Sequence, residues 1–202
     1  TPNPADTVCA ALHLQMITKA KRYLYLTTPY LAIDETITSA LCTAARSGVD
    51  VRIMTPHIPD KKVVFAVTQS NYPVLLEAGA RIYEFTPGFI HSKTVVADDL
   101  YASVGSCNLD YRSFYLQFEN GVWLCGDPAV LSVRDDFLPG GLPGDHPGRL
   151  PHPSPVPPAA PIHLPAVRAA VLMAPYRNRL AEHCSVRRFF SFSTGFCPGF
   201  LL

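Results

Sequence analysis

The chain has 202 residues, which is long enough for one domain with a substantial hydrophobic core and a further segment beside it. Its 17 lysines and arginines nearly balance its 16 aspartates and glutamates. This balance argues against the strongly basic surface typical of nucleic-acid-binding proteins and against an acidic tail. No apolar run approaches the roughly 18 residues of a transmembrane helix. The six cysteines lie apart without a Cys-x-x-Cys pair, so we expect no metal site.

The prolines divide the chain into two regions. Residues 127–202 contain 13 of the 20 prolines, and ten of these lie between Pro139 and Pro165. Because proline fixes φ and lacks an amide donor, this stretch cannot sustain a helix or a central strand. We therefore expect a folded domain over residues 1–137 and a Pro-rich linker with a poorly structured, irregular tail over residues 138–202.

Helices and strands alternate within the expected domain. In chain order, the hydrophobic pattern predicts a helix over 11–22, a strand over 23–27, a helix over 35–47, a strand over 49–54, a helix over 61–78 that Pro73 kinks, and strands over 80–85, 93–97, 101–104 and 121–125. Asp34 is a candidate N-cap, and Gly48 and Gly79 are candidate helix stops. Helices of about a dozen residues between short strands predict an α/β fold, with a mixed, mostly parallel sheet covered by helices on both faces.

The residues best suited to chemistry flank the strand that contains Lys93. Side chains alternate along a strand, so His91 and Lys93 emerge on one face. Residues 98–99 (Asp-Asp) have turn composition, so the strand over 101–104 can return antiparallel. The return brings residues 105–108, Gly-Ser-Cys-Asn, close to His91.

The polar groups that converge there suit an anion. Lys93, Ser106 and Asn108 offer hydrogen-bond donors, and a phosphate group fits that set. Glu119 lies just before the next predicted strand, where its carboxylate can receive the other ring N–H of a histidine such as His91. We interpret the remaining six histidines as structural.

The spacing His-x-Lys-x4-Asp-x6-Gly-Ser-x-Asn, complete from His91 to Asn108, resembles the signature of the phospholipase D superfamily. The flanking sequences narrow the resemblance to the C-terminal half of bacterial cardiolipin synthases. They are Thr-Thr-Pro-Tyr at 27–30, Ser-Gly-Val-Asp-Val-Arg-Ile at 47–53, Glu-Ala-Gly-Ala-Arg-Ile-Tyr-Glu at 77–84 and Asn-Leu-Asp-Tyr-Arg-Ser-Phe at 108–114. The resemblance covers about residues 10–137 and implies a phospholipase D-like half-domain.

The resemblance implies a phosphatidyltransferase that works through a phosphohistidine, without a metal or other cofactor. In the family, two such motifs meet at one pseudo-twofold site. One histidine attacks the phosphorus of phosphatidylglycerol, and the other protonates the departing glycerol. A second phosphatidylglycerol then takes the phosphatidyl group.

Carried onto this sequence, the family roles fall on the motif residues. His91 is expected to be the nucleophile or the general acid, and Glu119 to orient it. Asp98 belongs to the catalytic motif, as a structural partner rather than a participant in the chemistry. The expected phosphate-binding residues are Lys93, Ser106 and Asn108.

The resemblance also implies the partners and the location. The partners are a phospholipid substrate and a membrane surface, without nucleic acid. The location is the bacterial inner membrane, where this chain is peripheral. None of the other six histidines has a lysine two residues later, so we expect the second histidine from an N-terminal half outside this chain or from a second copy. Two alternatives stay open at this point: a phospholipase D-like phosphodiesterase or nuclease acting as a dimer, and an inactive fragment without its partner half.

Overall fold

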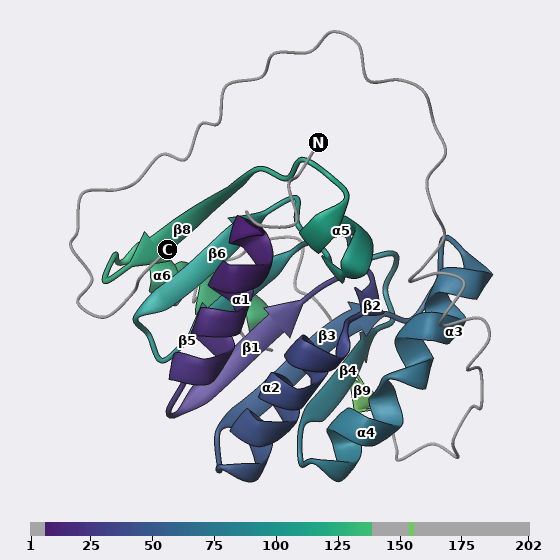
Figure 1. The fold of residues 1–202 in the computed structure, drawn as a ribbon, viewed down its shortest axis with the longest axis horizontal. Helices are drawn as coiled ribbons and strands as arrows, with labels where there is room; N and C mark the ends of the chain where they lie inside the picture. Colours follow the sequence, from purple (N-terminus) through teal and green to yellow (C-terminus); the bar gives the residue numbers. More distant parts are fainter. Residues whose placement is uncertain (1–6, 139–153, 156–202) are drawn as a thin grey trace, which may run out of the picture.

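The computed structural model describes residues 7–138 and 154–155, in which helices and strands alternate (Figure 1). The helices are α1 (Val8–Lys19), α2 (Glu35–Arg46), α3 (Lys62–Ser70), α4 (Tyr72–Glu77), α5 (Tyr111–Tyr115) and α6 (Ala129–Phe137). The strands are β1 (Tyr23–Thr27), β2 (Leu31–Ala32), β3 (Asp50–Pro56), β4 (Arg81–Phe85), β5 (Thr94–Ala97), β6 (Tyr101–Gly105), β7 (Leu109–Asp110), β8 (Gly121–Cys125) and β9 (Ser154–Pro155).

The main sheet has the strand order β8-β6-β5-β1-β3-β4-β9. Strands β1, β3 and β4 run parallel, because helices on the connections carry the chain back to the start of the next strand. Strands β5, β6 and β8 are antiparallel to their neighbours. The β5–β6 connection is too short for a crossover, and Asp98 and Asp99 make it a tight turn with φ of 58° and 61°. The predicted α/β fold, with a mixed sheet and helices on both faces, is confirmed.

Alternating side chains give the sheet two apolar faces. On one face, Leu24, Leu26 and Ile53 belong to the same buried cluster as residues of α1, α2 and α4. On the other face, Tyr25 stacks on Phe137 of α6 at 4.9 Å between ring centroids. Each large apolar side chain buried in this way contributes roughly 1.5–3 kcal/mol. The two layers thereby hold the sheet that carries the motif.

Local sequence signals explain several helix boundaries. Asp34 accepts a hydrogen bond from the Ile37 amide at 2.9 Å and caps α2 as predicted. Gly48 follows that helix with a φ of 90°, a conformation that favours glycine. The predicted kink at Pro73 is a break: α3 ends at Ser70 and α4 begins anew, since proline cannot donate to the preceding turn.

Four short elements within residues 7–138 were not predicted. Strands β2 and β7 form a separate two-stranded parallel pair, and α5 follows β7 directly. Helix α6 covers the second face of the sheet. Of the predicted tail over residues 138–202, only Leu138 and β9, which pairs with β4, lie within the described residues. The domain boundary stays a prediction. None of the helices in the described ranges has the length and apolar character needed to cross a bilayer.

Candidate active site

His91 and Lys93 lie in the loop that enters β5. Because β5 is antiparallel to β1, this loop lies at the edge of the sheet where β1, β3 and β4 end. The Lys93 amino group donates to the carbonyl oxygen of His91 at 2.6 Å and lies 2.9 Å from its Nδ1. An ammonium group only donates, so Nδ1 accepts and the ring hydrogen is on Nε2. The His91 ring itself is exposed to solvent.

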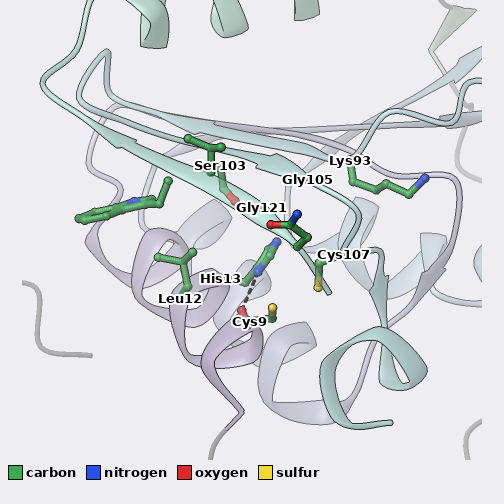
Figure 2. A pocket seen from close by; sticks show the side chains of 11 residues that line it. Cys9, Leu12, His13, Lys93, Ser103, Gly105, Cys107 and Gly121 are labelled. Carbon is green, nitrogen blue, oxygen red and sulfur yellow. Dashed lines mark hydrogen bonds between the residues drawn. The ribbon is translucent and has the colours of Figure 1, made fainter. Parts of the chain in front are cut away.

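Lys93 is held in a partly desolvated environment. Its side chain lines a small hollow with Cys107 and, from α1, Cys9 and His13 (Figure 2). Burial lowers the pKa of Lys93, while the carboxylates of Glu119 and Asp110 act in the opposite direction. A cation in such a place interacts strongly with an anion that enters beside it.

The Gly105–Ser106 segment is fixed by its contact with the loop before β8. The Ser106 amide donates to the Asn120 carbonyl oxygen at 2.8 Å, and the Asn120 amide donates to the Ser106 hydroxyl at 2.9 Å. A Cβ on Gly105 would lie 2.5 Å from that same carbonyl oxygen. The glycine of the motif is therefore required by the close approach of two backbones.

The structure differs from the prediction that Glu119 orients His91. The Ser106 hydroxyl donates to Glu119 Oε2, while Nδ1 of His91 is in contact with Lys93. The reason lies in the strand order. Glu119 precedes β8, which pairs with β6, so its carboxylate meets the end of β6, whereas His91 enters from β5. The carboxylate therefore acts on Ser106 directly and on Lys93 through its charge.

Asn108 directly precedes β7, the short strand that leads into α5. Its Nδ2 donates to the Ser113 hydroxyl at 3.2 Å. Its Oδ1 is buried, and no donor among the described residues reaches it. Asp110 caps α5 by accepting from the Ser113 amide at 2.6 Å, and burial raises the pKa of Asp110. Within this loop, Ser106 contacts Glu119 and Asn108 is turned towards α5.

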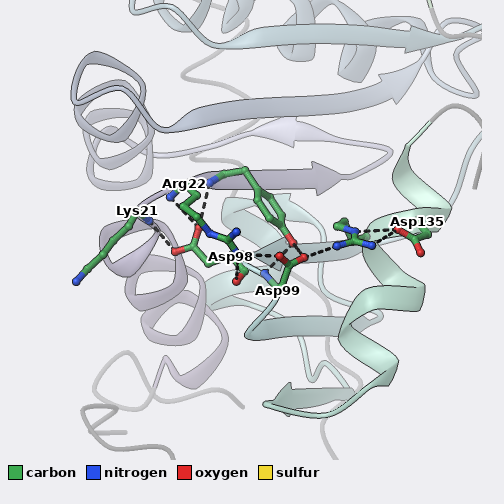
Figure 3. A network of polar contacts seen from close by, with 7 residues as sticks. Lys21, Arg22, Asp98, Asp99 and Asp135 are labelled. Atoms are coloured by element: carbon green, nitrogen blue, oxygen red, sulfur yellow. Dashed lines mark hydrogen bonds and ion pairs between the residues drawn. The ribbon is translucent and has the colours of Figure 1, made fainter.

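Asp98 lies at the end of β5 opposite His91. It belongs to a network of polar contacts with Lys21, Arg22 and Asp99 (Figure 3). Its Oδ2 accepts from the Lys21 amide at 2.7 Å, and its Oδ1 accepts from the amides of Arg22 and Tyr23 at 2.8 and 3.0 Å. The carboxylate thus holds the β5–β6 turn against the start of β1. Its contacts agree with a structural partner within the motif.

Two histidines interpreted as structural lie near the motif or at the same sheet edge. His13 is buried beside the hollow and donates from Nδ1 to the Cys9 carbonyl oxygen at 2.7 Å; burial lowers its pKa. His57 follows β3 and contacts Glu84. No sequence pattern indicates the contact between His57 and Glu84, because these residues are 27 positions apart. Among the described residues, no three His, Cys, Asp or Glu side chains gather closely enough to hold a metal ion.

Comparison with known sequences decides the family. The family described as "Cardiolipin synthase, PLD-like domain" matches residues 13–138, which include every motif residue discussed above. The chain belongs to this family. The resemblance noted from the motif and its flanks is thereby confirmed.

Curated relatives with the printed name "Cardiolipin synthase" come from several bacteria. The chain is 47% identical over 127 residues to that of Halalkalibacterium halodurans, covering 63% of this chain and 25% of the relative. It is 45% identical over 137 residues to that of Geobacillus thermodenitrificans, covering 68% and 27%. An uncharacterized protein of Streptococcus mutans is 44% identical over 137 residues, covering 68% and 30%. The chain therefore spans between 25% and 30% of the length of these relatives.

Solved structures show the same fold. The phospholipase D family member Nuc of Salmonella typhimurium aligns with a TM-score of 0.56 at 21% identity, covering 63% of this chain and 83% of that one. The phosphatidylserine synthase of Haemophilus influenzae aligns with a TM-score of 0.51 at 21% identity, covering 61% and 33%. At these identities the likeness concerns the fold alone.

Proposed function

We propose that the chain supplies one half of the catalytic centre of a cardiolipin synthase-type phosphatidyltransferase. Membership of the family and the names of its relatives support this reaction class. The observation that carries the proposal is the Lys93 ammonium group placed against His91 beside Ser106. This arrangement puts a cation, a hydroxyl and a ring nitrogen at the same edge of the sheet. The substrate is phosphatidylglycerol at the bacterial inner membrane surface.

The proposed reaction has two steps. A neutral imidazole nitrogen forms a bond to the phosphorus as the bond from phosphorus to the glycerol oxygen breaks, and a second, protonated histidine gives its proton to that oxygen. A hydroxyl of another phosphatidylglycerol then forms a P–O bond while the P–N bond breaks, and its proton returns to the second histidine. His91 is one of these two residues.

The described residues stabilise the charge on phosphorus. A phosphate oxygen is a better acceptor for an ammonium group than a neutral ring nitrogen, so bound substrate would draw Lys93 away from Nδ1 of His91. The freed Nδ1 can then carry the ring hydrogen and leave Nε2 with its lone pair. In this proposal the Ser106 hydroxyl turns from Glu119 and the Asn108 amide turns from Ser113, so that both donate to the same oxygens.

One histidine cannot fill both roles in a single step. Attack requires the neutral ring and proton donation requires the charged ring, and an ordinary imidazole with a pKa of about 6.5 is mostly in one form at a given pH. The second histidine therefore comes from an N-terminal half or from a second copy of the chain. Phe118 and Leu116, which flank Glu119 in the sequence, are 81% and 51% exposed. Their exposure supports a site that contacts a second, apolar surface.

Substitution of His91 tests the proposal. The test enzyme is a hybrid in which the whole chain follows the part of the Halalkalibacterium halodurans relative that precedes the matched segment. Transfer from labelled phosphatidylglycerol should fall by at least about a thousandfold in His91→Ala. Lys21→Ala, an exposed residue at the other end of β5, is the control and should retain activity. A His91→Ala enzyme with a tenth or more of the parent rate would overturn the proposal, and DNA cleavage without lipid transfer would favour the nuclease.

A further inference from the structure

We propose that His57, held by Glu84, binds a hydroxyl group of the acceptor alcohol and thereby selects a polyol over a simple alcohol. This inference rests on the proposed function, because it concerns the second substrate of the same site. It assigns a binding role to a residue pair that lies outside the phospholipase D motif.

The pair has a fixed geometry. Nδ1 of His57 lies 2.7 Å from Glu84 Oε2. A carboxylate only accepts, so Nδ1 carries the hydrogen and the lone pair of the neutral ring is on Nε2. The Glu84 side chain is 13% exposed and that of His57 is 56% exposed. A nearly buried carboxylate thus orients a ring that stays open to a ligand.

A buried chain of hydroxyl groups supports the carboxylate. The Tyr72 hydroxyl lies 2.6 Å from that of Thr55 and donates to Glu84 Oε1 at 3.4 Å. Tyr72 is 2% exposed and Thr55 is fully buried. Burial raises the pKa of Tyr72, so its hydroxyl remains a donor. An ordinary surface ion pair has no such support from the core, whereas histidines that bind ligands are commonly oriented by a supported carboxylate.

His57 lies at the same edge of the sheet as His91. Met54 of β3 and Thr94 of β5 both pair with Thr27 of β1, so these three residues form a row across the sheet. His57 and His91 each lie three residues beyond that row on the same side. With strands about 4.8 Å apart and β1 between β3 and β5, the backbone positions of the two histidines are roughly 10 Å apart.

The pair also lies on the same face as Lys93. Ile53 and Ile82 belong to the buried cluster that contains Val95. Glu84 shares the face of Ile82 by alternation along β4, and it contacts Tyr72 of the same cluster. Lys93 lines the hollow with residues of α1, a helix that covers this face.

Aromatic side chains lead from His91 towards the loop that contains His57. The ring of Phe89 lies 5.5 Å from that of His91 and 6.5 Å from that of Tyr30. The Tyr30 hydroxyl donates to Asp60, which is in the same loop as His57. Phe89 and Tyr30 thus provide apolar surface between His91 and the loop of His57, on which the carbon chain of a short polyol would pack.

The separation fits a phosphorus at His91 and a three-carbon alcohol that extends from it. One hydroxyl attacks the phosphorus, and another reaches Nε2 of His57. A hydroxyl both donates and accepts, so it can bind the neutral or the charged ring. His57 is thus a positioning and specificity residue for glycerol-type acceptors, with no covalent step of its own.

The test compares acceptors in the hybrid enzyme. Transfer of labelled phosphatidyl groups is measured with glycerol and with 1-propanol, which lacks the second and third hydroxyls. The parent should favour glycerol by roughly three- to tenfold in kcat/KM, the value of one or two net hydrogen bonds. His57→Ala should bring that ratio close to one by raising KM for glycerol, while the rate with 1-propanol stays within about twofold.

Matched variants separate binding from folding. His57→Gln keeps a group that hydrogen-bonds a hydroxyl and should retain part of the preference for glycerol. The preference of Glu84→Gln should lie between those of His57→Gln and His57→Ala. An unchanged ratio in His57→Ala, or an equal loss with both acceptors, would overturn the inference while leaving the proposed function intact. Transfer that persists in His91→Ala, or a parent without transfer to either acceptor, would overturn the proposed function and this inference with it.

Discussion

The two ends of β5 carry parts of one sequence motif in opposite physical states. At the site end, His91 is exposed, and the Lys93 amino group contacts a ring nitrogen that a phosphate oxygen can replace. At the turn end, both oxygens of Asp98 accept backbone hydrogen bonds, and Asp99 binds two arginines and a tyrosine. Groups with unused bonding capacity serve a ligand, and satisfied groups serve the fold.

Substitution of Lys93 should give the largest contrast between activity and stability. Lys93→Ala removes the cation that we propose stabilises the phosphoryl charge, so kcat of the hybrid enzyme should fall by about 10²–10³. The free energy of unfolding in urea should hardly change, because within residues 7–138 the amino group hydrogen-bonds only to the exposed His91. Lys93→Arg keeps the charge and should recover part of the activity. If Lys93→Ala lost stability but retained its activity, Lys93 would stabilise the fold rather than take part in the reaction.

Substitution of Asp98 should give the reverse pattern. Asp98→Ala leaves three backbone amides of residues 21–23 without their acceptor, which should lower the free energy of unfolding by about 3 kcal/mol. Asp98→Asn keeps one acceptor oxygen and should lose about half as much. Activity per folded molecule should remain close to that of the parent. A fall in activity of several orders of magnitude at unchanged stability would instead assign Asp98 to the chemistry.

Gly105 of β6 lies at the site end of β5, but it is required by the close approach of two backbones. Its substitution therefore tests whether a residue at the site end can contribute mainly to stability. Gly105→Ala would place its Cβ 2.5 Å from the Asn120 carbonyl oxygen, which should cost about 2 kcal/mol of stability and displace Ser106. Gly88→Ala is the matched control, since nothing lies within 4 Å of a Cβ there. Equal urea midpoints for the two variants would contradict the close packing of β6 and β8.

The smallest effect concerns the pH dependence at the turn end. Burial of Asp99 acts to raise its pKa, but hydrogen bonds from Arg22, Tyr23 and Arg134 outweigh it and hold the pKa below its ordinary value of 3.8. Because the pKa of Asp99 is lower in the folded than in the unfolded state, the carboxylate stabilises the fold at any pH above the unfolded-state pKa of about 3.8. This contribution is lost as the pH falls below that value towards the folded-state pKa. Urea unfolding between pH 7 and pH 3 should therefore show a smaller acid loss in Asp99→Asn than in the parent. Parallel curves would contradict the assignment.

Much of the fold could be predicted because its signals are local. The cap at Asp34, the strand at 23–27 and the contact between His91 and Lys93, two residues apart, each depend on a few neighbouring residues. Strands β2 and β7 have two residues each and α5 has five, which is too short for a hydrophobic period to appear.

The partners of the site residues were harder to predict, because they depend on strand order. Glu119 was expected to contact His91, yet the pairing of β8 with β6 brings it to Ser106. The His57–Glu84 contact likewise follows from the pairing of β3 with β4. A sequence motif identifies which residues take part, and the register of the sheet decides which of them meet.

The most direct test of the central claim is the activity of the whole chain as a monomer. Size-exclusion chromatography with light scattering would isolate the monomer, and turnover of labelled phosphatidylglycerol would be measured before and after addition of the separately expressed N-terminal part of the Halalkalibacterium halodurans relative. The two-histidine site predicts no turnover by the monomer and transfer once the second part is added. A monodisperse monomer that turns over phosphatidylglycerol unaided would contradict the claim.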